Sequence, residues 1–286
     1  MRRAWRCILR LIPPVRNAAA NGADAAAATQ PRAPPRRDGR PSPVHVAGSR
    51  AEADVVAAGA EAVVQAPARL AVFDCDGTLV DSQANICVAC EAAFVGAGMP
   101  PPPRAAIRRI VGLSLVEAMQ VLLPEADDAS HRRLAQDYKD AYGAMRISGA
   151  LQDEPLFVGI EQVLADLAAS GWVLGVATGK SDRGLAHVLA AHGLADRFVT
   201  LQTADRHPSK PHPAMLEAAM AEAGAVPATT VMIGDTSFDM AMARAAGARG
   251  IGVAWGYHAV GELTLAGADC VATDVADLPG LMMEIA

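Results

Sequence analysis

From Arg69 onward, short apolar runs alternate with segments whose apolar residues recur every three or four positions. The short runs are typical of buried strands, and the periodic segments are typical of amphipathic helices. The expected strands are RLAVF (69–73), WVLGVAT (172–178), RFVTLQ (197–202), VMIGD (231–235) and GIGVAW (250–255).

Helices are expected between these strands, at 182–192, 214–223 and 238–246. Gly193 and Gly247 follow the first and the last of these helices, and glycine is common at helix ends. Strands that alternate with helices indicate an α/β fold. The pattern therefore predicts a Rossmann-like, doubly wound parallel sheet with helices on both faces.

A mainly helical block at about 83–157 interrupts this alternation immediately after the first strand. Its apolar residues follow helical spacing, as Leu115 and Met119 do. We therefore expect an α/β core formed by 68–82 and 158–286, with a helical cap formed by 83–157 inserted into it.

Residues 1–67 have a different composition, rich in alanine, proline and arginine and with little apolar periodicity. Such a segment buries too little surface to offset the entropy lost on ordering, so we expect a disordered basic extension. Its first dozen residues differ, because Trp5, Ile8 and Leu9 share one helical face that arginines flank. A basic amphipathic start resembles an organellar transit peptide, which leaves an organellar location as an alternative.

Charge is distributed unevenly along the chain. The first fifty residues carry ten arginines against two aspartates, and because the whole chain is −6, the remaining residues sum to −14. A body this acidic repels a phosphate backbone, which argues against a nucleic acid polymer as partner. No apolar run approaches the roughly 20 residues of a membrane-spanning helix, so we expect no membrane partner. Five cysteines, an odd number, favour a reducing compartment and thus the cytoplasm.

Polar residues cluster at the ends of several expected strands, where open parallel sheets bind their ligands. Asp74 and Asp76 follow the first strand, and a lysine precedes the helix at 214–223. The candidate residues are Asp74, Asp76, Thr178, Lys210, Asp235 and Asp239. Each alone is weak support, because aspartates also cap helices, but their joint arrangement indicates one site.

Carboxylates that converge on one place require a hard cation with oxygen ligands, and Mg²⁺ is the best candidate. A lysine and a threonine hydroxyl supply donors for an oxyanion, so together these groups predict a phosphate site. Aspartate can act as a nucleophile and form an acyl-phosphate that water later hydrolyses. A second carboxylate two residues further on points to the same face of the strand and can protonate the leaving oxygen.

Four motifs in this order resemble the haloacid dehalogenase superfamily: DCDGTLVDS (74–82), ATGKS (177–181), SKPHP (209–213) and GDTSFDM (234–240). More specifically, they resemble its subfamily IA, in the phosphoglycolate phosphatase-like branch. The resemblance covers about 68–286. The first motif is the most specific and the last is next.

The resemblance implies roles for the matching residues. Asp74 would be the nucleophile and a magnesium ligand, and Asp76 would be the general acid and base, with its backbone carbonyl on the metal. True dehalogenases of this superfamily lack the second aspartate, so Asp76 favours phosphotransfer.

The remaining motif residues would bind the phosphoryl group or the metal. The resemblance implies that Thr178 and Lys210 hold the phosphoryl group, with the lysine also stabilising the nucleophile. Asp235 would ligate magnesium, and Asp239 would bind it through water or orient its neighbours. The implied cofactor is Mg²⁺.

The inserted block matches the mobile cap of this superfamily, which brings specificity residues over the phosphate. The candidates are Arg108, Arg109, Gly112 and Ser114, in the segment IRRIVGLS. The alternative is that the two arginines are solvated residues of a helix face.

The predicted function is hydrolysis of a small phosphorylated metabolite through an aspartyl-phosphate, with 2-phosphoglycolate as the leading substrate. The expected partner is thus a small-molecule phosphomonoester. One alternative is a sugar-phosphate mutase similar to β-phosphoglucomutase, which uses the same intermediate. The other is a non-catalytic phosphate-binding regulatory protein, against which the complete set of candidate residues argues.

Overall fold

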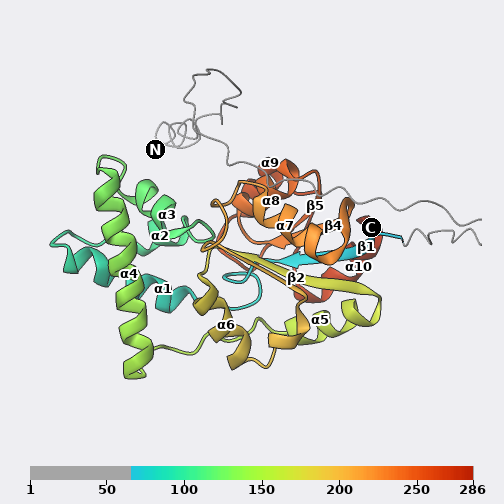
Figure 1. Cartoon of the computed structure of the whole chain (residues 1–286), viewed down its shortest axis with the longest axis horizontal. Coiled ribbons are helices and arrows are strands. Elements are labelled where there is room, and N and C mark those ends of the chain that lie inside the picture. Colours follow the sequence, from blue (N-terminus) through green and yellow to red (C-terminus); the bar gives the residue numbers. More distant parts are fainter. Residues whose placement is uncertain (1–65, 286) are drawn as a thin grey trace, which may run out of the picture. The chain divides into compact units, whose positions relative to one another are not determined.

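A computed structural model describes residues 66–285 of the chain (Figure 1). The predicted extension at 1–67 lies almost entirely outside the described residues. None of the helices within 66–285 is long and apolar enough to cross a membrane.

Six parallel strands form one sheet in the order β3-β2-β1-β4-β5-β6. The strands are β1 (Ala68–Phe73), β2 (Trp172–Thr178), β3 (Thr200–Thr203), β4 (Ala225–Gly234), β5 (Arg249–Val253) and β6 (Cys270–Ala272). The chain moves outward from β1 to β3 in one direction and from β4 to β6 in the other. The strand order therefore reverses between β1 and β4, and ligands of open α/β sheets bind beyond the carboxyl ends of the strands at such a point.

Helices cover both faces of the sheet, as the pattern predicts (Figure 1). They are α5 (Ile160–Ala169), α6 (Asp182–Ala191), α7 (Ala214–Ala223), α8 (Ser237–Ala245), α9 (Val260–Ala266) and α10 (Leu278–Ile285), with short 3-10 helices at Ala195–Arg197 and Val275–Asp277. The side chains of β1 alternate between the two faces. Leu70 and Val72 pack with α7 and α8, whereas Ala71 and Phe73 pack with α5, α6 and α10. The first strand is thus buried on both sides, which fixes the position of the loop that follows it.

Four helices form the cap between β1 and α5: α1 (Gln83–Gly96), α2 (Arg104–Arg108), α3 (Leu115–Leu122) and α4 (Asp128–Ser148). They enclose an apolar cluster of their own, with Phe94, Ile107 and Leu134 at its centre. The helical part is shorter than the expected 83–157, because Gly149 takes a left-handed conformation and ends α4. The chain then returns to the core, where Leu156 forms a bridge with Val80.

The sequence pattern predicts most elements of the core closely, and α7 has the bounds expected for it. The strand expected at 197–202 begins later, at Thr200, because Ala195–Arg197 forms a 3-10 turn. The strand β6 and the helices α9 and α10 were not predicted.

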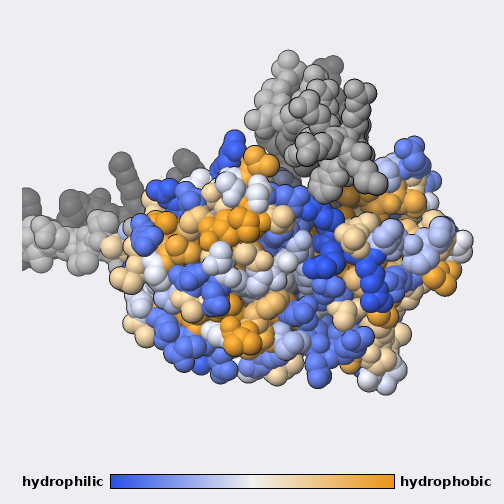
Figure 2. Space-filling view, turned by 180° about the vertical axis from the view of Figure 1, so that it is seen from behind, coloured by the Kyte–Doolittle hydropathy of each residue, from blue (hydrophilic) through white to orange (hydrophobic). Residues whose placement is uncertain are grey.

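The exposed large apolar side chains come from separate elements, among them Ile147, Val158, Leu265 and Met283. On the face shown in Figure 2, apolar patches alternate with polar side chains. On that face the described residues therefore build no continuous apolar surface.

Gly77, in the loop after β1, has a φ of 82°, and a Cβ atom there would lie 2.3 Å from Asp235 Oδ2. Gly98 is a matched control, because its φ is 73° but nothing lies within 4 Å of its Cβ position. We expect Gly77→Ala to lower the free energy of unfolding by about 2 kcal/mol more than Gly98→Ala does, measured by denaturant unfolding. Equal losses would show that the loop can move away from Asp235.

Candidate active site

Two of the predicted carboxylates meet because their strands are neighbours. Asp74 follows β1 and Asp235 follows β4, and the Asp74 N–H donates to the Ile233 carbonyl at 2.9 Å, which extends the pairing of the two strands. Asp239 lies in the first turn of α8. Carboxylate oxygens of Asp74, Asp235 and Asp239 all lie within 4.8 Å of one another, and all three residues are fully buried.

Lys210 joins this cluster from the loop before α7. Its Nζ lies 2.9 Å from Asp74 Oδ1 and 2.6 Å from Asp239 Oδ1, and the side chain is buried. Burial acts to lower the pKa of Lys210, but the carboxylates of Asp239 and Asp74 outweigh burial and hold the pKa above its usual range. Lys210 is therefore a charged group at the centre of the site.

Asp239 orients its neighbours. Its Oδ2 accepts hydrogen bonds from the Thr236 N–H at 3.0 Å and from the Thr236 hydroxyl at 2.6 Å, in a capping box at the start of α8. Its Oδ1 accepts from Lys210. Both oxygens are thus engaged with protein groups. Sequence reasoning missed Thr236, although a threonine three residues before an aspartate is a typical helix-start signal.

Asp235 is held by hydrogen bonds from two loops, the one after β1 and the one after β5. Its Oδ1 accepts from the Thr78 hydroxyl and its Oδ2 from the Tyr257 N–H, each at 2.9 Å. A Cβ on Gly256 would lie 2.2 Å from the Asp235 Cβ, so this close approach requires glycine. Burial, followed by the neighbouring carboxylate of Asp74, raises the pKa of Asp235 well above its usual range.

The two oxygens of Asp74 differ. Oδ1 accepts from Lys210 and from the Cys75 N–H at 2.7 Å, whereas Oδ2 is buried without a hydrogen-bond partner. Burial raises the pKa of Asp74 to about 7, although the charge of Lys210 acts to lower it. Three carboxylates thus face one ammonium group, with one orphaned oxygen. The converging carboxylate oxygens of Asp74, Asp235 and Asp239 suit a divalent cation.

Asp76 lies beside this cluster and forms a second ion pair. Lys180 Nζ is 2.8 Å from Asp76 Oδ1, which also accepts a hydrogen bond from the Ser82 hydroxyl. Ser82 and Lys180 lie within the motifs DCDGTLVDS and ATGKS, but the sequence assigned them no role. Thr178, buried at the end of β2, accepts the Lys180 N–H at 3.3 Å. The turn after β2 therefore links Thr178 to Lys180, the ion-pair partner of Asp76.

The cap residues predicted for specificity lie in different environments. Arg108 is exposed on α2, while the guanidinium of Arg109 pairs with Glu262 on α9 and its carbonyl accepts from His258. The Ser114 N–H donates to the Ser209 hydroxyl at 2.8 Å. Among these four residues, Gly112 alone lines the cavity beside Asp76.

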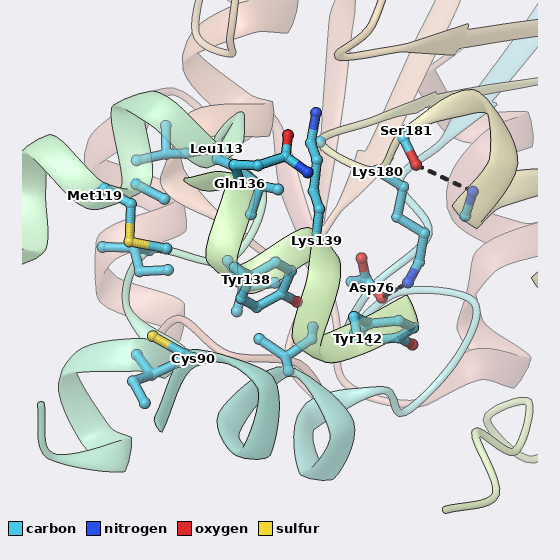
Figure 3. Close-up of a pocket in the computed structure, with 18 of the residues that line it drawn as sticks. Asp76, Cys90, Leu113, Met119, Gln136, Tyr138, Lys139, Tyr142, Lys180 and Ser181 are labelled. Atoms are coloured by element: carbon cyan, nitrogen blue, oxygen red, sulfur yellow. Dashed lines mark hydrogen bonds and ion pairs between the residues drawn. The ribbon is translucent and has the colours of Figure 1, made fainter. Parts of the chain in front are cut away.

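A cavity of about 340 Å³ separates the cap from the site (Figure 3). Asp76, Lys180 and other residues from the turn after β2 and the start of α6 line it from the core. The four cap helices and the segment between α2 and α3 line the rest. A cavity with a carboxylate, an ammonium group and a nearby buried acid cluster is suited to substrate binding and group transfer.

Comparison with known proteins assigns the family. Residues 71–253 match the haloacid dehalogenase-like hydrolases, and the chain belongs to this family. The probable phosphatase IndB of Dickeya dadantii is 40% identical, over 69% of this chain and 86% of that protein. The phosphoglycolate phosphatase of Yersinia pseudotuberculosis is 30% identical, over 72% of this chain and 89% of that protein.

Solved structures share the fold. The β-phosphoglucomutase of Clostridium difficile has a TM-score of 0.63 and 18% identity, over 76% of this chain and 98% of that chain. The family and the phosphatases among the relatives identify this chain as a phosphatase, which confirms the predicted enzyme class.

Stability without metal should depend on the protonation of Asp74. Its pKa is about 7 in the folded protein, against 3.8 as the ordinary value. Between these values the folded protein holds a proton that the unfolded chain releases, so the free energy of unfolding falls as pH rises. We expect the Tm in chelator to fall between about pH 5 and pH 7, and to fall less in Asp74→Asn. Identical declines in both proteins would contradict the raised pKa.

Proposed function

We propose that this phosphatase hydrolyses a small phosphomonoester with Mg²⁺, through a phosphorylated Asp74. The observation that carries the proposal is the asymmetry of the Asp74 carboxylate. Its Oδ1 is held by Lys210 and a backbone N–H, while its Oδ2 is buried and without a partner. A fixed carboxylate with one free oxygen is prepared for nucleophilic attack.

In the first step, Thr178 and Lys210 bind the phosphoryl oxygens and Asp74 Oδ2 attacks phosphorus. The new bond to Asp74 forms as the bond between phosphorus and the leaving oxygen breaks. Asp76, which must be protonated when the substrate is bound, donates that proton to the leaving oxygen, so the product leaves as an alcohol. Lys180 and Ser82 hold the Asp76 side chain in place for this transfer.

In the second step, water attacks phosphorus and Asp76, now a carboxylate, accepts the proton of that water. The bond between phosphorus and Asp74 breaks, which releases inorganic phosphate and restores the free carboxylate. Lys210 holds Asp74 in both steps, because its ammonium group is anchored on Asp239.

The residues of the acid cluster fit a magnesium ion. The Asp74 and Asp235 side chains and the Asp76 carbonyl would hold it, and Asp239 would act through its contacts or through water. When bound, Mg²⁺ supplies positive charge against the phosphoryl oxygens. The convergence of the Asp74, Asp235 and Asp239 carboxylate oxygens, all within 4.8 Å of one another, supports this part of the proposal.

The relatives suggest a first substrate for testing, 2-phosphoglycolate, which the name of the Yersinia protein implies for that protein. The mutase alternative uses the same aspartyl-phosphate but returns the phosphoryl group to a sugar. Hydrolysis is favoured here because the curated relatives described above carry phosphatase names. The complete set of catalytic side chains argues against a purely regulatory role.

We place this activity in the cytoplasm, with small phosphomonoesters as partners. The described cysteines, Cys75, Cys87, Cys90 and Cys270, are all free thiols, which agrees with a reducing compartment. The organellar alternative depends on residues outside the described part of the chain.

Phosphate release from a panel of phosphomonoesters tests the proposal. We expect release with Mg²⁺ and none with chelator. In Asp74→Asn, which removes the nucleophile but keeps the side-chain shape, kcat should fall by about a thousandfold or more. Substantial activity of a folded Asp74→Asn protein would exclude Asp74 as the nucleophile. Conversion of a hexose 1-phosphate into its 6-phosphate, with little free phosphate, would favour the mutase.

Asp76→Asn separates the two chemical steps. The variant keeps the nucleophile but lacks the group that protonates the leaving oxygen and later takes a proton from water. A substrate whose leaving group needs no proton, such as p-nitrophenyl phosphate, leaves only the second step dependent on Asp76. With this substrate we expect the variant to accumulate phosphorylated protein in a burst, followed by steady-state turnover about a hundredfold slower than in the wild type. Burst and steady-state rates that both match the wild type would show that Asp76 transfers no proton.

A further inference from the structure

The contacts of the Asp76 carboxyl group are on one of its oxygens. Oδ1 lies 2.8 Å from Lys180 Nζ and also accepts a hydrogen bond from the Ser82 hydroxyl. When Asp76 is protonated, Oδ1 stays an acceptor for these two donors, so the proton resides on Oδ2. Proton transfer needs Oδ2 within about 3 Å of the leaving oxygen. The group that holds Lys180 in place therefore also directs the proton of Asp76.

Lys180 is a long side chain at the wall of the cavity, and its position needs support. A lysine loses several freely rotating bonds when its ammonium group is held in one place. The Tyr142 ring lies beside it, with the ring centre 6.0 Å from Nζ. Figure 3 shows this ring next to the Lys180 ammonium group and Asp76. Because an aromatic face attracts an ammonium group and occupies space beside it, the ring confines Lys180 to Asp76.

Tyr142 is itself held by Glu154, in the segment that returns from the cap to the core. The Tyr142 hydroxyl donates to Glu154 Oε1, and the same oxygen accepts from Asn85 Nδ2 at 2.9 Å. Asn85 is buried, and its amide both donates to the Gln152 carbonyl and accepts from the Gln152 N–H, each at 2.9 Å. Hydrogen bonds to a carboxylate are stronger than those between neutral groups. The edge of the Tyr142 ring is thus tied to a fixed acceptor.

Both crossings between the core and the cap meet at this network. The first crossing carries Ser82, which donates to the carboxyl group of the general acid, and Asn85, which donates to Glu154. The second crossing carries Glu154 itself. Tyr142 belongs to α4 of the cap, whereas Lys180 belongs to the turn after β2 in the core. The arrangement around the general acid therefore depends on α4 lying against the core.

We propose that Tyr142 and Glu154 are positioning residues for Asp76, the general acid and base. Glu154 holds the Tyr142 ring, the ring confines the Lys180 ammonium group, and Lys180 fixes the oxygen of Asp76 that does not carry the proton. The inference rests on the proposed function, because it assigns residues to the proton transfers of that same site. Efficient proton transfer is thereby restricted to the state in which α4 packs against the core.

Two substrates isolate the acid step. The value of kcat/KM covers the reaction up to release of the alcohol, so it contains the protonation of the leaving oxygen but not the attack of water. Ethyl phosphate needs that proton, whereas p-nitrophenyl phosphate does not. The ratio of kcat/KM for ethyl phosphate to that for p-nitrophenyl phosphate therefore reports the acid, and Asp76→Asn should give its lowest value. A general loss of folding lowers both values alike and leaves the ratio unchanged.

Variants of Tyr142 test the ring and its hydroxyl separately. Tyr142→Leu removes the ring and should lower the ratio by about tenfold. Tyr142→Phe keeps the ring but frees it from Glu154, and should lower the ratio by about threefold. Tyr138→Phe is the matched control, because it changes the other tyrosine of α4 that lines the cavity and leaves the bond to Glu154 intact. An unchanged ratio in folded Tyr142→Leu, or an equal loss in Tyr138→Phe and Tyr142→Phe, would overturn the inference.

Variants of Glu154 test whether the two residues act through one contact. Glu154→Gln keeps an oxygen that can accept from Tyr142, so it should retain most of the ratio, whereas Glu154→Ala should lower it at least as much as Tyr142→Phe does. Adding Tyr142→Phe to Glu154→Ala should lower the ratio no further, since both changes break the same bond. Losses that add would contradict a shared pathway to Asp76.

The outcomes for the two proposals differ. If Asp76→Asn lowers the ratio while folded Tyr142→Leu and Glu154→Ala do not, the proposed function stands and the positioning role falls. If Asp76→Asn leaves the ratio unchanged, Asp76 is not the acid, and the acid step of the proposed function falls together with the positioning role.

Discussion

The buried ammonium group of Lys210 is the contact on which the rest of the site depends. It lies between Asp74 and Asp239, and both carboxylates are withdrawn from water. Breaking a buried ion pair by removing one partner costs about 3–5 kcal/mol, because the remaining charge stays buried without compensation. Lys210 therefore allows an acid cluster to exist in the core and at the same time directs one oxygen of Asp74 away from the protein's own donors. The same contact thus stabilises the buried acid cluster and leaves one Asp74 oxygen free to react.

The sheet supplies this geometry and the cap supplies the surroundings. Neighbouring strands β1 and β4 deliver Asp74 and Asp235 to one edge, and α8 returns Asp239 to it. The segment from Arg109 to Ser114 contacts the core on both sides of the site, through Glu262 and through Ser209. The cap is thereby held beside Asp76, and its helices line the cavity that reaches this residue.

Most of the core was predictable, because strand runs and helix periodicity are local properties of the sequence. The residues of the acid cluster were also predictable, since strand ends and motif spacing place them together. The side chains that pair with these residues could not be predicted from the sequence. Lys180 pairs with Asp76 and Thr236 anchors Asp239 only after loops distant in sequence converge. Arg109, within the cap, is a further example, because its ion-pair partner Glu262 lies more than a hundred residues away in the sequence.

The central claim is that the reaction passes through an acyl phosphate on Asp74, and trapping that intermediate tests it most directly. Protein that is turning over a phosphomonoester would be quenched in acid and treated with borohydride, which reduces an aspartyl-phosphate to homoserine. Mass spectrometry of the digest should then show homoserine at position 74, and only in samples that contained substrate. Turnover with no modification at Asp74, or with the modification at another aspartate, would contradict the account.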